Sequence, residues 1–409
     1  MRRFQLSFLL LWLVAPVLAQ AEPAGEECTV GVACGRATAD GRPLLWKNRD
    51  ARERDNVVLA LADGRIPYFG LCNAGNSDAV WGGANVAGFC IVNAVSRDLP
   101  EGSDQGPANG AFIKLALQQC ETVAQFEELL RATDTSGRRT RANFGVIDAQ
   151  GAAAFFEAGH ACFRRFDAEG AASGVLLRTN FSVTGGGDRG RERLARAEEL
   201  CAAPAARRLT PRFLLQQLLR DVKAPPSASA GGKGRLDVRE TIHRQNTVAA
   251  LVLHGVKAGE DAKWTTMWAV LGQPLFAMAV PLWPAAGVVP RSLSGDPKSS
   301  LCDLSQRLAD AFYAVDAGAA GADDQGSEGD IAGAVRWLRS DTMPLARRGV
   351  LFGEAEILAR YEDVLANWRQ GAGAPPPTVQ RAFQEAMAKL AAQRLQDLVD
   401  EFAAASTVK

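Results

Sequence analysis

Short apolar runs separated by turn residues fill the first two thirds of the chain, and longer helical patterns fill the last third. Apolar runs of four to eight residues bounded by Gly, Pro, Asn and Asp are typical of β-strands. They predict strands at Thr29–Ala33, Pro43–Trp46, Asn56–Leu61, Gly88–Val95, Asn143–Asp148, Ala152–Glu157, Gly174–Leu177, Thr247–Leu253, Thr265–Leu271 and Leu275–Leu282.

Helical periodicity appears in two blocks, one between the strands and one after residue 300. The predicted helices are Asn109–Gln119, Val123–Arg131 with Thr122 as N-cap, Arg191–Cys201, Glu354–Arg369 and Val379–Ala404. Pro225–Gly234 and Asp316–Asp330 are predicted loops, because both are rich in Gly, Ala, Ser, Pro or Asp. Strand-rich and helix-rich segments are therefore partly segregated, which predicts an α+β fold.

The N-terminus has the pattern of a secretory signal peptide. Arg2 and Arg3 precede an apolar stretch from Leu6 to Leu18, and Ala19-Gln20-Ala21 has the small residues of a cleavage site. The sequence therefore predicts a signal peptide at 1–21 and export to the periplasm or the extracellular space. Cleavage after Ala21 leaves a short polar propeptide at 22–27, directly before Cys28.

The stretch from Cys28 to Asp50 reads as a β-hairpin that turns at Asp40-Gly41. It carries Cys28 at its start and the cluster Lys47–Asp50 where the chain returns. If the propeptide is removed, Cys28 combines a thiol with an α-amine of pKa near ~8, which can accept the thiol proton. The alternative is a buried structural cysteine beside a solvated charged turn.

Composition narrows the function classes. The chain has 409 residues, with 46 basic and 46 acidic side chains, and this balance predicts no nucleic-acid partner and no membrane binding after signal removal. Its three histidines are scattered and frame no Cys-His or Ser-His-Asp hydrolase, and no C-x-x-C suggests zinc. We expect neither a metal nor a cofactor. Eight cysteines in an exported chain are compatible with disulfides, although a nucleophilic Cys28 leaves an odd number.

The opening C-T, the A-T-A-D-G turn and the N-x-D that ends at Asp50 resemble the N-terminal nucleophile hydrolases of linear amides. These include choloylglycine hydrolases, penicillin V acylases, acid-ceramidase-like enzymes and isopenicillin N acyltransferases. The resemblance implies a four-layer αββα sandwich and covers roughly Cys28–Trp283. The C-terminal residues lie outside the resemblance and have the pattern of an appended helical region, so the predicted domain bounds are 28–290 for the sandwich and 291–409 for the C-terminal helical extension.

The resemblance also implies roles for six residues. Cys28 is the nucleophile and Asp50 orients its amine. Asn85, in a G-x-N-x-x-G turn, and Asn180, after a strand, match the donors to the oxyanion. Arg193 matches a supporting arginine, although Arg189, Arg191 and Arg196 compete for that role. Lys47 stands where the choloylglycine enzymes carry an arginine, which puts bile-salt specificity in doubt.

The predicted function is therefore cleavage of a linear amide C–N bond of a small molecule, by an exported enzyme that gains its N-terminal cysteine by autoprocessing. Acyl transfer to an amine and dipeptide cleavage remain alternatives within the same superfamily. A non-catalytic exported binding protein is an alternative of a different class. The sequence names neither half of the substrate and leaves the oligomeric state open, a homo-oligomer included.

Overall fold

The computed structural model describes residues 27–102, 105–206, 208–228, 233–295, 297–315, 336–371 and 373–407. The predicted signal peptide and most of the propeptide lie outside these residues, as does the predicted loop at 316–330. Glu27, the last residue of the propeptide, is the first described residue and is already part of a strand.

A six-stranded antiparallel sheet contains the predicted hairpin. Its strand order is β10-β1-β2-β12-β13-β14. The strands are β10 (Val175–Arg178), β1 (Glu27–Ala33), β2 (Leu44–Asp50), β12 (Thr247–His254), β13 (Thr266–Leu271) and β14 (Val280–Leu282). The hairpin is confirmed, but β2 extends through the charged cluster, which lies in the strand rather than in a turn. Gly41 has a φ of +77°, the left-handed conformation that the turn requires.

A seven-stranded antiparallel sheet follows the chain order from β3 to β9. Its strands are β3 (Asn56–Leu61), β4 (Tyr68–Asn73), β5 (Gly82–Asn85), β6 (Cys90–Val95), β7 (Ala142–Ile147), β8 (Ala153–Ala158) and β9 (Phe163–Asp167). The run Tyr68–Asn73 and the charged segment Phe163–Asp167 were not predicted as strands. The second of these lies at a sheet edge and has only two apolar residues, Phe163 and Phe166, so it shows no continuous apolar run.

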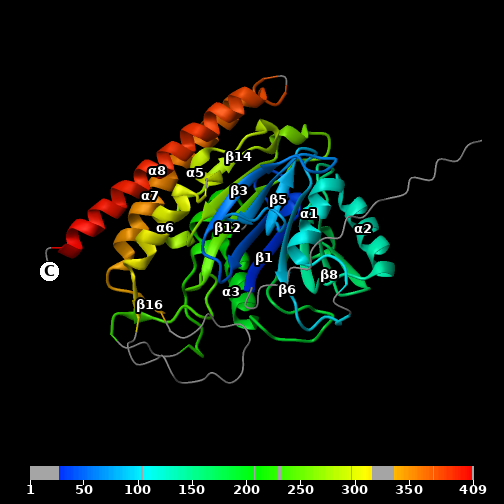
Figure 1. The fold of residues 1–409 in the computed structure, drawn as a ribbon, viewed down its shortest axis with the longest axis horizontal. Helices are drawn as coiled ribbons and strands as arrows, with labels where there is room; N and C mark the ends of the chain where they lie inside the picture. The colour runs from blue at the N-terminus through cyan, green and yellow to red at the C-terminus, as the bar shows by residue number, and fades with distance from the viewer. Residues whose placement is uncertain are drawn as a thin grey trace, which may run out of the picture.

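Two sheets packed face to face form the centre of the molecule, and helices cover both outer faces (Figure 1). Strand β6 contacts β1 and β2 across the interface between the sheets. Helices α1 (Asn109–Gln119) and α2 (Val123–Ser136) pack on the seven-stranded sheet, and α3 (Arg191–Ala202) and α4 (Pro211–Gln216) pack on β10 and β12. This is the predicted αββα sandwich.

Helices of the C-terminal region cover the β14 side of the six-stranded sheet (Figure 1). They are α5 (Arg291–Ser294), α6 (Ser300–Asp310), α7 (Met343–Trp368) and α8 (Pro377–Thr407). Trp283 stacks on Tyr361 of α7 and meets Phe383 of α8 edge-on. One buried apolar cluster thus includes both the strand residue Val30 and Leu395 of α8.

A small third sheet has the order β11-β16-β15 and lies beside these helices. Its strands are β11 (Arg235–Leu236), β16 (Arg336–Arg339) and β15 (Tyr313–Val315). The predicted strand Leu275–Leu282 is only partly confirmed. It begins with a 3₁₀ turn at Pro274–Phe276, where the proline at its start cannot donate to a ladder, and only its last three residues form β14.

Candidate functional site

The register of β1 against β2 decides which side chains meet around Cys28. Cys28 lies opposite Arg49, and Glu27 lies opposite Asp50. Cross-strand partners share one face of a sheet and neighbouring residues alternate between faces. Cys28 therefore faces the seven-stranded sheet together with Lys47 and Arg49. The side chains of Glu27 and Asp50 lie on the opposite face, toward α3.

The backbone of Cys28 is held by two of the predicted site residues. The Cys28 amide donates to Asn180 Oδ1 at 3.0 Å. Arg193 Nη1 donates to the Cys28 carbonyl at 3.1 Å, and its Nη2 donates to the same Asn180 oxygen at 2.9 Å. Asn180 Nδ2 donates to the Val95 carbonyl on β6 at 3.0 Å, which fixes the orientation of the amide. All three side chains are buried. The structure thus brings Cys28, Asn180 and Arg193 together.

Asp50 lies beside this group and is completely buried. Its Oδ1 accepts a hydrogen bond of 2.7 Å from the hydroxyl of Thr247, and its Oδ2 lies 3.6 Å from Arg244. A register irregularity between Thr247 and Ala249 places Thr247 directly opposite Asp50. Burial raises the pKa of Asp50 to about 6, against the opposing effect of the two nearby arginines. Within the part of the chain that the structure describes, Asp50 Oδ2 accepts no hydrogen bond.

Glu27 completes the arrangement as the centre of an arginine cluster. Its carboxylate accepts from Arg193 at 2.9 Å and from Arg189 Nε at 2.7 Å, and it pairs with Arg244. Burial acts to raise the pKa of Glu27, but the three arginines outweigh it and hold the pKa at about 2. The residue before the predicted N-terminus is therefore a buried, fully charged carboxylate.

Lys47 is buried between the sheets, and its ammonium donates to the Trp81 carbonyl at 3.0 Å and to Asn93 Oδ1 at 2.8 Å. The cross-strand neighbour of Cys28 is instead Arg49, whose guanidinium lies over the Trp81 ring, 4.6 Å from its centroid. Arg49 belongs to the charged cluster of the hairpin, but sequence analysis gave it no role. Only the register between β1 and β2 determines that Arg49, and not Lys47, lies opposite Cys28.

Asn85 lies elsewhere, and the structure does not bring it to Cys28. Its amide donates to the carbonyls of Leu117 and Cys120, at 3.0 and 2.7 Å, and its Oδ1 accepts from the backbone of Ala87 and Phe89. These bonds close the turn between β5 and β6 and tie it to the end of α1. Both amide hydrogens are engaged, so Asn85 is a turn residue here and not a donor toward Cys28.

The arginines that competed with Arg193 in the sequence have separate positions. Arg189 binds Glu27, Arg196 pairs with Asp221 at 2.7 Å, and Arg191 is exposed over the Phe181 ring. Arg244, which contacts both Glu27 and Asp50, was missed entirely. It lies 194 positions after Asp50 (244 − 50) and before a strand with no special motif, so only strand pairing reveals it.

Histidines and cysteines form no second reactive group. His243 and His254 are buried, and burial lowers their pKa values to about 3 and about 4. All eight cysteines lie within the described residues, and none is paired in a disulfide. Across the described ranges, no group of three or more His, Cys, Asp or Glu side chains is placed to hold a metal ion.

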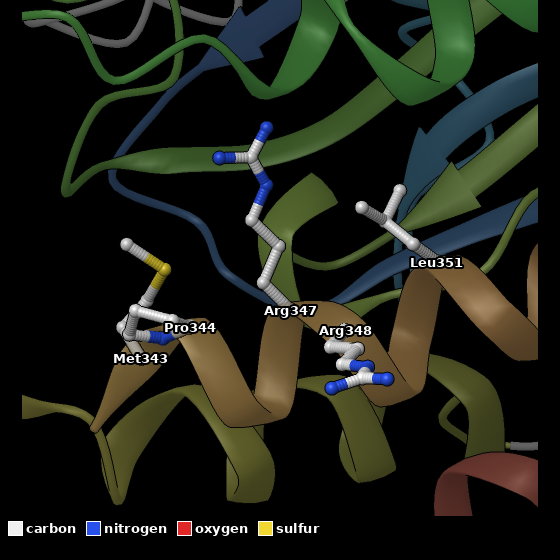
Figure 2. A pocket seen from close by; sticks show the side chains of 5 residues that line it. All are labelled: Met343, Pro344, Arg347, Arg348 and Leu351. Carbon is white, nitrogen blue, oxygen red and sulfur yellow. The ribbon is translucent and has the colours of Figure 1, made fainter.

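Two recesses lie in the described surface. One, of about 240 Å³, is lined by Met343, Pro344, Arg347, Arg348 and Leu351 of α7. Figure 2 shows Arg347 extending away from this helix while Arg348 lies along it. None of the predicted site residues lines it. The other, of about 220 Å³, is lined in part by Ala51, Asn246 and Thr247 and therefore adjoins Asp50. We consider the second recess relevant, because it borders the charged group around Cys28.

The protein is thus a four-layer sandwich. Its strand β1 carries a buried cysteine whose backbone is bound by an asparagine and an arginine. No protein-family model matches the chain, and no curated protein matches it. No helix among the described residues is long and apolar enough to cross a membrane.

Several solved structures are similar in outline. One is an N-acylethanolamine-hydrolysing acid amidase orthologue of Caenorhabditis elegans, with 14% identity, 56% of this chain and 92% of that chain covered, and a TM-score of 0.41. A penicillin V acylase of Agrobacterium tumefaciens has 14% identity, with 63% and 86% covered and a TM-score of 0.38. A variant of the conjugated bile acid hydrolase of Clostridium perfringens has 11% identity, with 62% and 92% covered and a TM-score of 0.38. Likenesses this weak establish no family membership, so the function rests on the site itself.

Proposed function

We propose that this chain is an exported amidohydrolase that cleaves a linear amide C–N bond with Cys28 as its N-terminal nucleophile. The observation that carries the proposal is the hydrogen bond from the Cys28 amide to Asn180 Oδ1, in a buried group with Arg193. The nitrogen that would become the α-amine is already held by a side chain.

In the proposed mechanism, removal of the propeptide creates the free α-amine of Cys28. Cys28 is 1% exposed and Glu27 6% exposed, and the bond between them lies inside a strand. An external protease needs an accessible extended segment, so we assign the cleavage to Cys28 itself. Its sulfur attacks the Glu27 carbonyl, the C–N bond breaks, the proton goes to the departing amine, and water then hydrolyses the thioester.

The same steps act on a substrate. The free α-amine takes the thiol proton, and Cys28 Sγ attacks the amide carbonyl. Asn180 Nδ2 donates to the oxyanion, a contribution usually worth several kcal/mol. Asp50 lies opposite the position that Glu27 vacates, and its Oδ2, which accepts no hydrogen bond from the described residues, would orient the new amine. The amine leaves with the proton, and water releases the acid. The histidines take no part.

Intact-mass analysis of the exported protein tests this proposal, together with Cys28→Ala. The wild-type protein should begin at Cys28. Cys28→Ala should retain residues upstream of position 28, keep a near-wild-type melting temperature and lose all turnover of amides, because no sulfur remains to carry the acyl group. Cys34→Ala is the control, since Cys34 is a buried cysteine that follows the opposite end of β1, where its amide donates to the Gly174 carbonyl. An active protein that begins at Glu22, or an active Cys28→Ala variant, would contradict the mechanism.

A further inference from the structure

Three arginines converge on one side chain that the mature enzyme would lack. Arg193 comes from the first turn of α3, Arg189 from the segment before that helix and Arg244 from the segment before β12, and all three contact the Glu27 carboxylate. The side chains of Arg193, Arg244 and Glu27 are at most 8% exposed. This is a built anion site occupied by a residue of the propeptide.

Removing Glu27 changes the charge balance of this site. The arginine side chains remain protonated at any physiological pH, and processing adds the α-amine of Cys28 as a further cation. Asp50 lies 3.6 Å from Arg244, and the half-exposed Glu240 lies 3.7–3.8 Å from Arg244 and Arg193. Two carboxylates then face three guanidinium groups and an amine. Buried charges of one sign require a partner, so the place of the Glu27 carboxylate favours another anion.

We propose that the substrate carries a carboxylate on its acyl half, bound by Arg189, Arg193 and Arg244 where the Glu27 side chain lay. This inference rests on the proposed function. It assigns the anion to the acyl half because processing and turnover transfer the same part of the molecule to Cys28. In each, the Sγ–C bond forms, the C–N bond breaks and the nitrogen departs with the proton.

Glu27 also indicates the length of the acyl group. Its carboxylate carbon is separated from the carbonyl carbon joined to Cys28 by three carbons, Cα, Cβ and Cγ. A glutaryl group has the same spacing between its scissile carbonyl and its free carboxylate. The expected substrate class is therefore amides of glutaryl or α-glutamyl type. An anion on the amine half would lie across the scissile bond and would leave before the thioester is hydrolysed.

The test compares two chromogenic amides on protein shown by mass to begin at Cys28. Glutaryl-p-nitroanilide carries the carboxylate, and the p-nitroanilide of glutaric acid monoamide has the same length without the charge. We expect kcat/KM to favour the charged amide by at least about 10²-fold, because a site built for a polar group strongly rejects an analogue that lacks it.

Arg189→Met should lower this preference about tenfold, because it lowers kcat/KM for the charged amide more than for the uncharged one. Arg189 suits this test because its guanidinium binds Glu27 and neither Cys28 nor Asn180 among the bonds found. Arg191→Met is the matched control. It removes the same charge two residues away, where the guanidinium contacts the Gly187 carbonyl and the Phe181 ring, and the preference should persist.

A second measurement separates this inference from the proposed function. Glutarate should bind the same protein more tightly than its monoamide, and Arg189→Met should abolish the difference. Equal hydrolysis of both amides, or selectivity only for a carboxylate on the amine half, overturns the inference and leaves the amidase intact. If neither amide is cleaved while glutarate binds through Arg189, the anion site stands and the proposed function fails. Absence of glutarate binding overturns the anion site.

Discussion

Two buried carboxylates of this protein are bound by arginines, and they are organised differently. Glu354 on α7 faces a single arginine, Arg220, through two bonds of 2.6 and 2.8 Å, and it also accepts from the Ala279 amide at 2.9 Å. Arg220 donates in addition to three backbone carbonyls. Both side chains are fully buried. Every charge here has its counterpart.

In the cluster around Glu27 the charge balance depends on Glu27 itself. Three arginines surround Glu27, and the neighbouring Asp50 keeps an oxygen that accepts no hydrogen bond from the described residues. Burying charges is costly, so a one-to-one pair with satisfied hydrogen bonds is what a structural role requires. Without Glu27, the carboxylates of Asp50 and Glu240 face three arginines, so the proposed loss of the propeptide would leave an excess of positive charge next to Cys28. The comparison therefore separates a self-contained ion pair from a cluster whose charge balance would change with the proposed processing.

The largest expected change in stability tests the structural half of this comparison. Glu354→Gln leaves Arg220 buried without its counter-charge, and removing one partner of a buried pair typically costs about 3–5 kcal/mol. Denaturant unfolding should show this loss, with near-normal kcat in the folded fraction. Glu362→Gln is the control on the same helix. Its pair with Arg212 is exposed, so the loss should stay below about 1 kcal/mol. A denaturant midpoint of Glu354→Gln equal to that of the wild type would contradict the structural role of the Glu354–Arg220 pair.

Asn180→Asp tests the other side of the comparison, the proposed catalytic role of the group around Cys28. The aspartate keeps an acceptor for the Cys28 amine and Arg193 but loses the Nδ2 donor. Removing one oxyanion donor typically lowers kcat by about 10²–10³. We expect this loss with little change in KM, since the donor acts in the transition state. Steady-state kinetics on protein confirmed to start at Cys28 measures it. A wild-type kcat in this variant would show that Asn180 is not an oxyanion donor.

The pH dependence of stability distinguishes Glu27 from Asp50 in the unprocessed Cys28→Ala protein. The pKa of Glu27 is lowered from 4.5 to about 2, so its contribution to stability is present above about pH 4.5 and is lost as the pH falls toward 2. The shift corresponds to a contribution on the order of 3 kcal/mol. The pKa of Asp50 is raised to about 6, so its contribution has the opposite sign: it is present below pH 3.8 and lost as the pH rises through 6.

Melting temperatures of Cys28→Ala and of Cys28→Ala with Glu27→Gln, measured from pH 7 to pH 2, isolate the Glu27 contribution. The decline between pH 4.5 and 2 should be shallower in the double variant. Identical profiles would show that the three arginines do not hold Glu27 ionised.

The smallest effect concerns Asn85. Asn85→Asp loses the donors to Leu117 and Cys120 and leaves these buried carbonyls unsatisfied, which costs about 1–3 kcal/mol. We expect a lower melting temperature with kcat near that of the wild type, the reverse of Asn180→Asp. A large loss of kcat at unchanged stability would return Asn85 to the site.

Local signals in the sequence were sufficient for most of the fold. The bounds predicted for Asn56–Leu61 and Asn109–Gln119 are those of β3 and α1, because apolar periodicity and turn residues act over a few neighbours. Thr122 caps α2 as predicted, since its hydroxyl accepts from the amide of Gln125, three residues on. Edge strands such as Phe163–Asp167 were missed because half-solvated strands lack a continuous apolar run.

The sequence by itself also determined the hairpin that carries Cys28, Lys47 and Asp50, and it pointed to Asn180 and Arg193. It did not determine which asparagine and which cation lie at the cysteine. Packing against the end of α1 engages the Asn85 amide, and the β1–β2 register puts Arg49 rather than Lys47 opposite Cys28. Arg244 reaches Glu27 and Asp50 only because β12 pairs with β2. The contact between Arg244 and Glu27 joins residues 217 positions apart. Contacts of this kind are decided by strand pairing and packing, which short-range patterns do not encode.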